Sequence, residues 1–458
     1  MPQYIIEKQK KPPVVLAWIA LILMTSNIYH TRLMILFGMY SEGATVVMQA
    51  VAVGCLFAYL LLGKGLRLGQ VRLRLTDVLM ILSLAVVAAF TTNWQGNLTY
   101  IIRYGVYVLI VILLKYDEKL THIAFWCILA AGLLHILFTI WFPLDMDFYL
   151  KNIYPSFTPA QQKQLYGQML YNGYSAGIAV HYSVNGMYMA ITLCCTYALL
   201  LTARKKTAAL VLFMINLLAL IMTGKRGAMV FVVFAMLWAY MLWSKRAFGD
   251  KVLCVLVGVA AGALALYLLG FYNESVAATF TRWERTLWGN DNADVSNGRF
   301  QLYRVAWDLF MKHPLTGIGW REFTNQMQLY NGGSSQLMDT HNVFLQLLCE
   351  TGIVGCGVFT ALFATAYCTA LKQLSRELSA KQRRLLLFSL CYQTFFLCYC
   401  LTGNPLYDHE TLFAYIISVA AVGVLDAQNK PFAVGSKYIN AFPEEDYATN
   451  GIGDHTGL

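Results

Sequence analysis

Twelve long runs of apolar residues divide this sequence, and they constrain its fold more than any other feature. Each run is close to the ~20 residues that an α-helix needs to cross the hydrocarbon core of a bilayer. The sequence therefore predicts an all-α polytopic membrane protein of about twelve transmembrane helices. The runs are Val14 to Tyr29, Ala44 to Leu62, Asp77 to Thr91, Leu98 to Leu114, His122 to Phe142, Ser183 to Leu201, Thr207 to Met222, Gly227 to Trp243, Val252 to Phe271, Asn342 to Leu371, Leu385 to Leu401 and Thr411 to Leu425.

The composition excludes a soluble globule. Of the 458 residues 58% are hydrophobic and 13% are charged, which leaves too little polar surface to cover a water-soluble protein of this length. The formal net charge is +10. In a soluble protein this charge would suggest nucleic acid as a partner, but in a membrane protein basic residues anchor the cytoplasmic loops. We therefore expect contact with membrane lipids and no nucleic-acid partner.

The placement of the basic residues predicts the topology. If the chain starts in the cytoplasm, 22 of the 34 lysines and arginines fall in the tails and in short cytoplasmic turns, and the other 12 fall outside. Both termini are then cytoplasmic, and the two long loops, residues 143–182 and 272–340, are extracytoplasmic. The domain prediction is helices 1–9 within 1–271, the loop 272–340, helices 10–12 within 341–426, and a cytoplasmic tail over 427–458.

The cysteines do not indicate a disulfide framework or a zinc site. All 11 lie within the apolar runs, from Cys55 to Cys400, and neither long outer loop contains one. No pair of acidic residues has the spacing of a metal site. We therefore expect no metal and no cofactor.

The loop from Tyr272 to Thr340 is too long for a simple connection, and loops of this length are usually functional or disordered. This one is rich in tryptophan, and Leu302, Ala306, Leu309 and Phe310 recur at helical spacing. The pattern predicts an amphipathic helix that lies on the membrane surface or caps a cavity. The loop contains six basic and seven acidic residues, so its net charge is close to zero. Any binding of an anion would therefore depend on individual arginines.

The turn Thr223 to Gly227 carries two cations, Lys225 and Arg226, at the predicted outer surface, against the positive-inside bias. One interpretation is that both reach lipid headgroups. The other is a phosphate clamp, because a guanidinium offers a planar fork to phosphate oxygens and the glycines allow close approach.

His341 lies where the second loop re-enters the membrane, after Asp339 and Thr340, either of which is a candidate N-cap. The positive end of the helix dipole would lower the pKa of His341 and keep it neutral, able to accept a proton from a sugar hydroxyl. The alternative is a polar residue at a helix interface. Glu350, nine residues later, is either a functional carboxyl or the structural partner of a buried polar group.

The first outer loop is rich in aromatic residues, which either stack on sugar rings or form an interfacial belt. A weaker polar cluster precedes the last helix, and its alternative explanation is ordinary solvation of a loop. The aromatic set is Tyr149, Tyr154, Phe157, Tyr166, Tyr171, Tyr174, His181 and Tyr182, and the polar cluster is Asp408, His409 and Glu410.

A set of motifs lies in the last half of the chain. In order, they are Gly298-Arg299, Trp307, the run Pro314 to Gly319, Phe323, His341-Asn342, Leu345, Glu350, Gly352 and Gly355. This series resembles the shared core of the O-antigen ligase and Wzy-type polymerase superfamily. Lys225-Arg226-Gly227 upstream and the long loop before the histidine agree with this resemblance.

The resemblance implies a GT-C-like helical fold and a metal-independent, inverting glycosyltransferase. Its implied donor is a glycan on undecaprenyl pyrophosphate, and its acceptor is a glycan or a lipid-linked glycan. By motif position, Arg226 and Arg299 would bind the pyrophosphate and His341 would orient or deprotonate the acceptor hydroxyl. The family often has a small hydroxylated residue where this chain has Lys225, so Lys225 itself is expected to share the phosphate.

The remaining candidates for substrate binding are Arg304, Arg321, Glu350 and Tyr182. Any of the four arginines Arg282, Arg285, Arg304 and Arg321 could equally pair with acids of the loop. The expected function is O-antigen ligase-like transfer on the outer face of the bacterial inner membrane, in cell-surface polysaccharide assembly. A repeat-unit polymerase would use the same residues. A flippase for lipid-linked sugars is the alternative from another class, but transporters place charged residues near the bilayer midplane.

Overall fold

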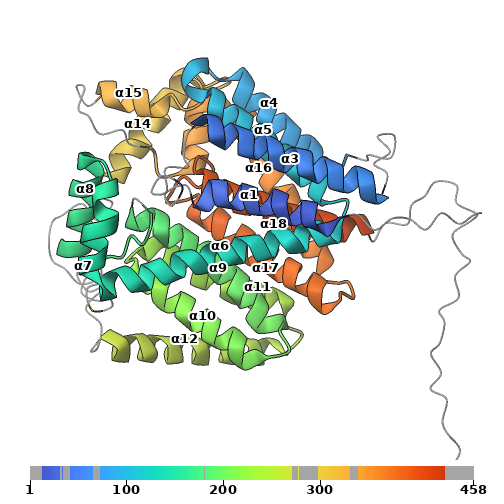
Figure 1. The fold of residues 1–458 in the computed structure, drawn as a ribbon. Helices are drawn as coiled ribbons and strands as arrows, with labels where there is room; N and C mark the ends of the chain where they lie inside the picture. Colours follow the sequence, from blue (N-terminus) through green and yellow to red (C-terminus); the bar gives the residue numbers. More distant parts are fainter. Residues whose placement is uncertain are drawn as a thin grey trace, which may run out of the picture.

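The computed structural model describes residues 13–30, 34, 42–64, 73–179, 181–270, 277, 298–330 and 339–428. Every regular element in these ranges is helical. A helix lies in each of the twelve predicted apolar runs (Figure 1). These helices are α1 (Val14–Tyr29), α3 (Glu42–Lys64), α4 (Leu75–Ala89), α5 (Trp94–Leu114), α6 (Glu118–Leu144), α9 (Tyr182–Thr202), α10 (Lys206–Met222), α11 (Arg226–Trp243), α12 (Phe248–Gly270), α16 (Val343–Gln373), α17 (Ala380–Tyr399) and α18 (His409–Gln428).

By length and composition, six helices of the described residues are able to cross a membrane, and four more are shorter and apolar. The six are α5, α6, α9, α11, α16 and α18. The predicted class, an all-α polytopic membrane protein, is thus confirmed. The count of about twelve spans stays a prediction.

Local sequence explains where several of these helices begin. Asn93 caps α5 by accepting a hydrogen bond from the backbone N–H of Gly96, and Asp117 caps α6. Ser379 and Gln382 form a reciprocal capping box at the start of α17. Such caps satisfy N–H groups that lack a partner in the first turn of a helix.

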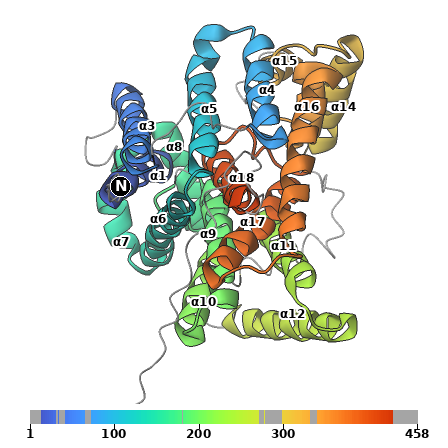
Figure 2. The same ribbon diagram turned by 90° about the vertical axis from the view of Figure 1, so that its right-hand side faces the viewer.

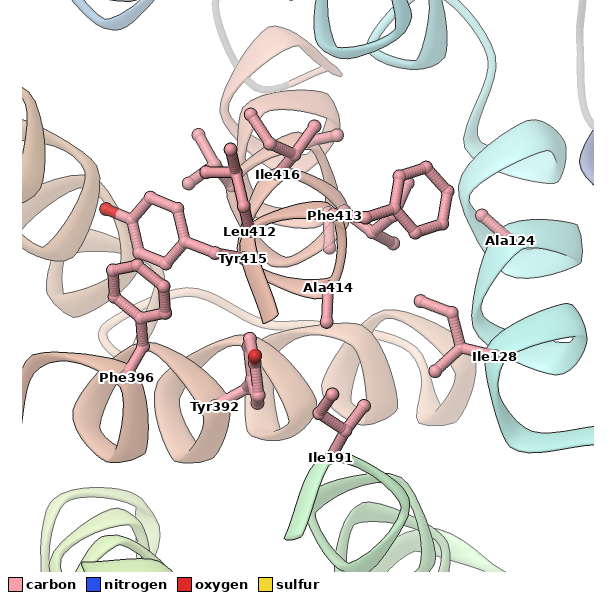
Figure 3. Close-up of a cluster of buried hydrophobic side chains, with 14 of the residues drawn as sticks. Ala124, Ile128, Ile191, Tyr392, Phe396, Leu412, Phe413, Ala414, Tyr415 and Ile416 are labelled. Carbon is pink, nitrogen blue, oxygen red and sulfur yellow. The ribbon is translucent and has the colours of Figure 1, made fainter. Parts of the chain in front are cut away.

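The core lies around α18, which is buried on nearly all sides. Figure 3 shows Phe413, Tyr415 and their neighbours of α18 surrounded by side chains of α17, α6 and α9. The rings of Phe396 in α17 and Tyr415 are stacked with their centroids 4.3 Å apart. A helix that is apolar all round belongs in the centre of a bundle, as α18 does here.

One end of the bundle carries the turns that were predicted to be cytoplasmic. Arg74 before α4 forms an ion pair of 2.8 Å with Asp426 near the end of α18, and Arg376 after α16 pairs with the same carboxylate at 3.6 Å. Lys115 pairs with Asp77 in the same region, with both side chains buried. Charged groups that are buried in this way are usually paired.

The opposite end carries the described parts of both long loops. The first loop contains α7 (Met146–Phe148) and α8 (Pro159–Leu165), and the second contains α14 (Arg299–Lys312) and α15 (Phe323–Tyr330). Figure 1 shows all four at the same end of the molecule, and Figure 2 shows α14 and α15 beside α16. The two loops therefore lie on one side, as the predicted topology requires. The side of the membrane to which this end belongs stays a prediction, and the tail after 428 lies outside the described residues.

Candidate active site

The first part of the site is the turn between α10 and α11. Gly224 has a φ of 65°, and Thr223 before it is fully buried. Lys225 is the N-cap residue of α11, and Arg226 is its first residue and is half-buried. The Lys225 ammonium lies 5.8 Å from the ring centroid of Tyr399, at the end of α17. The two predicted cations are thus held at a helix start by a tight glycine turn.

The second part is the start of α14, where Arg299 is the first helical residue and is half-buried. Leu302 and Ala306 are buried, and together with Val305 they pack against Phe323, Met327 and Cys349. The predicted amphipathic helix is confirmed. Its apolar face packs on α15 and α16, and this packing fixes the position of the Arg299 backbone.

The third part is the turn that carries His341. Its φ is 55°, in the left-handed region that non-glycine residues seldom adopt. The N-cap of α16 is Asn342, whose side chain accepts a hydrogen bond of 3.1 Å from the N–H of Leu345. The prediction that Asp339 or Thr340 caps this helix is therefore wrong. The reason is that the Asp339 carboxylate and the Thr340 hydroxyl both bond to the side chain of Gln346 instead.

Gln346 is the centre of the network that holds this turn, and its side chain is almost completely buried. Its Oε1 accepts hydrogen bonds from the N–H and hydroxyl of Thr340, at 3.3 and 3.1 Å, and from Nδ2 of Asn404 at 2.7 Å. Its Nε2 donates to Asp339 at 3.2 Å and to Glu350 at 3.0 Å. Five hydrogen bonds of one amide thus hold Asp339 and Thr340, the two residues before His341, to α16 and to Asn404.

Electrostatic effects on His341 connect the three parts of the site. Burial lowers the pKa of His341, and the positive charges of Arg299 and Lys225 lower it further, while Asp339 opposes them. The direction agrees with the prediction of a neutral histidine, although the causes now identified are burial and neighbouring cations. Arg299 and Lys225 therefore both lie close enough to act on the same imidazole, which is half-buried.

Asp408 also belongs to this region, although the sequence interpretation gave its cluster little weight. Removal of water by the surrounding protein raises the pKa of Asp408, and the negative charges of Glu410 and Asp339 raise it further, while the cations Lys225 and Arg321 oppose the rise. In the sequence, only its place in the polar run of Asp408, His409 and Glu410 before the last helix indicated that Asp408 could belong to the site.

Glu350 lies behind the site and not in it. It is fully buried and accepts hydrogen bonds from the Tyr407 hydroxyl at 2.8 Å, the Phe323 N–H at 3.3 Å and Gln346. This position fits the structural alternative, in which Glu350 supports the turn of His341 through Gln346.

The other candidates lie at the same end of the bundle. Arg321 is exposed with a φ of 62°, and its guanidinium lies 5.5 Å from the ring centroid of Tyr100. Arg304 is exposed on α14, and Tyr182 is half-buried at the first position of α9. Arg282 and Arg285 lie outside the described residues.

The run Pro314 to Trp320 pairs with a break in α16 at Gly352, where φ is 63° and ψ is −167°. The N–H groups of Ile318 and Gly319 donate to the carbonyls of Cys349 and Glu350, both at 2.9 Å, and the Ile353 N–H donates to Pro314 at 2.9 Å. A broken helix leaves backbone groups without partners, and here the preceding loop supplies them. The glycines of this motif thus allow two backbones to approach closely.

Within the described ranges no group of three His, Cys, Asp or Glu side chains is placed to hold a metal ion. The site consists of the cations Lys225, Arg226 and Arg299, the neutral His341 and the carboxyl group of Asp408. Such a set is able to bind an anionic group and to accept a proton beside it.

Residues 209–360 match the family model for O-antigen ligase. The matched segment contains Lys225, Arg226, Arg299, His341 and Glu350, and ends before Asp408. No curated protein matches the chain.

Proposed function

We propose that this chain is a glycosyltransferase of cell-surface polysaccharide assembly, and the match of residues 209–360 to the O-antigen ligase model supports this proposal. It moves a glycan from undecaprenyl pyrophosphate to an acceptor hydroxyl on a glycan or lipid-linked glycan. The observation that carries the proposal is that the end of α17 contacts both cation and histidine segments: the Lys225 ammonium lies 5.8 Å from the Tyr399 ring, and the Val343 N–H, two residues after His341, donates to the Cys400 carbonyl at 2.8 Å. The charges of Lys225 and Arg299 both lower the pKa of His341. A cation pair for pyrophosphate and a neutral base then lie together, although they come from three separate helices.

The cations serve the leaving group. Arg226 and Arg299 bind the pyrophosphate through their guanidinium forks, and Lys225 shares it. As the bond between the sugar C1 and the phosphate oxygen breaks, the electron pair goes to the pyrophosphate, where fixed cations stabilise the developing charge. The fixed positions of these cations lower the barrier, because the protein need not reorganise during the reaction.

His341 serves the acceptor. The acceptor oxygen attacks C1 from the face opposite the leaving group, so that the configuration at C1 inverts, and its proton passes to the neutral imidazole. The proton is then released to water, which restores the base. No step in this scheme requires a metal ion.

The further candidates have supporting roles. Arg304 and Arg321 are exposed beside the site and would bind other polar groups of the substrates, and Tyr182 would contact the glycan. Glu350 would support the site without contacting the substrate, because its buried carboxyl already accepts hydrogen bonds from Tyr407, Phe323 and Gln346.

We place the protein in the bacterial inner membrane with both termini in the cytoplasm and the site outside. The distribution of basic residues supports this orientation, as does the location of both long loops at one end of the bundle. A flippase would need its charged residues near the middle of the bilayer. Here the cations and histidine lie at helix starts, which favours the transferase.

The test is transfer of glycan from purified lipid-linked donor by the detergent-solubilised protein. Arg226→Ala should lose transfer, whereas Arg246→Ala, beyond the other end of α11, should retain it. The products separate the two family activities: a ligase attaches the finished glycan to a different acceptor, and a polymerase lengthens the lipid-linked glycan by repeat units. Equal activity of the two variants, or movement of the lipid across vesicles without transfer, would refute the proposal.

A further inference from the structure

His181 is a second histidine at the outer end, and none of the roles given above uses it. It is the N-cap of α9, where its Nδ1 accepts a hydrogen bond of 2.9 Å from the N–H of Ser183. A neutral imidazole that accepts at one nitrogen carries its proton on the other. The contact with Ser183 therefore fixes Nε2–H as a hydrogen-bond donor.

The ring of His181 is held firmly in place. It lies 4.5 Å from the ring of Tyr182, which lies 5.3 Å from the ring of Tyr174. The Tyr174 ring covers Gly224 so closely that a Cβ there would come within 2.3 Å of it. Gln168 binds the backbone N–H groups of both tyrosines. A column of rings thus connects His181 to the turn that carries Lys225.

The side chain of Lys225 packs against the first turn of α9, and its charge reaches His181. Burial lowers the pKa of His181 to about 4, and the charge of Lys225 contributes to the shift. At neutral pH the imidazole is therefore uncharged and remains a donor. Its side chain is half-buried, so it is accessible to a ligand. Gly186, one turn into α9, packs against the Lys225 side chain so closely that a Cβ added at Gly186 would lie 2.6 Å from the Cβ of Lys225.

We propose that His181 binds the pyrophosphate of the lipid-linked donor, giving a hydrogen bond from Nε2–H to a phosphate oxygen that Lys225 also contacts. The assignment rests on the proposed function, since it extends the phosphate site of that reaction. A fixed neutral donor beside an ammonium group complements an anionic oxygen with two lone pairs. The two histidines have opposite tasks: His181 donates to the leaving group and His341 accepts from the acceptor.

The test must separate ligand binding from helix capping. Asparagine is a good N-cap residue, so His181→Asn preserves the cap but removes the donor at the Nε2 position. His181→Ala removes both. His313→Asn is the matched control, because His313 is an exposed histidine at the end of α14. The probe is undecaprenyl pyrophosphate without sugar, and binding is measured on the full-length protein in detergent.

We expect His181→Asn to unfold at the parent's temperature and to bind the probe about tenfold more weakly, which corresponds to about 1.4 kcal/mol. His181→Ala should bind as weakly and unfold at a lower temperature, and His313→Asn should behave as the parent. At saturating donor the kcat of His181→Asn should fall by less than that of His341→Ala, because Lys225, Arg226 and Arg299 still stabilise the leaving pyrophosphate.

Parent-like binding by His181→Asn would show that His181 is only a cap and would overturn this assignment alone. If the parent itself failed to bind undecaprenyl pyrophosphate, the proposed function would fall together with it.

Discussion

Replacing Gln346 by methionine tests whether its hydrogen bonds hold His341 in its working position. Methionine has a similar length and no amide, so the five bonds to Asp339, Thr340, Asn404 and Glu350 are lost. At about 0.5–1.5 kcal/mol for each net bond, five bonds contribute about 2.5–7.5 kcal/mol. The left-handed backbone of His341 costs about 1–3 kcal/mol. The bonds outweigh the strain, and without them the turn is expected to relax.

We expect kcat of Gln346→Met to fall by about 10- to 100-fold, because a displacement of about 1 Å in a reacting group has an effect of this size. Donor affinity should change little, since Lys225, Arg226 and Arg299 lie on other helices. Glycan transfer and donor binding are measured on the same purified protein. Gln373→Met is the control, because Gln373 is equally buried on α16 but bonds to Asp426 at the other end. A folded Gln346→Met protein with the parent's kcat would refute the reasoning.

The other predictions concern the charged residues of the site and the backbone that supports it. His341→Ala should lower transfer by ~10²- to 10⁴-fold with donor binding intact, and parent-like turnover would make the histidine structural. Arg299→Lys should retain part of the transfer activity and Arg299→Ala only a small residual part of it. Since the charge of Arg299 lowers the pKa of His341, the neutral base persists below pH 6.5, and Arg299→Gln should move the acid limb of the residual activity to higher pH. A cysteine at exposed Leu329 should react with an impermeant thiol reagent in spheroplasts, and labelling only after membrane rupture would reverse the topology. Gly352→Ala should lower stability by about 2–4 kcal/mol in thermal unfolding, whereas Gly357→Ala, which meets no atom within 4 Å, should not.

The helices were predictable because the bilayer leaves an apolar chain few choices. Each apolar run became a helix, since a backbone in lipid must satisfy its hydrogen bonds internally. The spacing of Leu302 and Ala306 also located the buried face of α14 correctly. In both cases the signal is periodic and local, so the amino-acid order alone carries it.

The details of the site depend on contacts that the order of residues does not reveal. Asp339, Thr340 and Asn342 are all good capping residues, and the bonds of the first two to Gln346 leave the cap to Asn342. The interruption of α16 at Gly352 was equally hidden, because its partners belong to a loop more than thirty residues earlier. In the sequence His181 is one residue of an aromatic set, and only the ring contacts through Tyr182 and Tyr174 connect it to the turn of Lys225.

The pairing at Gly352 also determines which parts of the outer end are free to open. If α14 swung away from α16, the loop after it would withdraw the N–H groups of Ile318 and Gly319 from the carbonyls of Cys349 and Glu350. Buried carbonyls without partners are costly, so α14, this loop and the first turns of α16 should move as one rigid unit. Arg299 would then approach a substrate as part of a fixed wall. Segments that lack this backbone pairing would therefore have to move for a bulky lipid-linked glycan to enter the site.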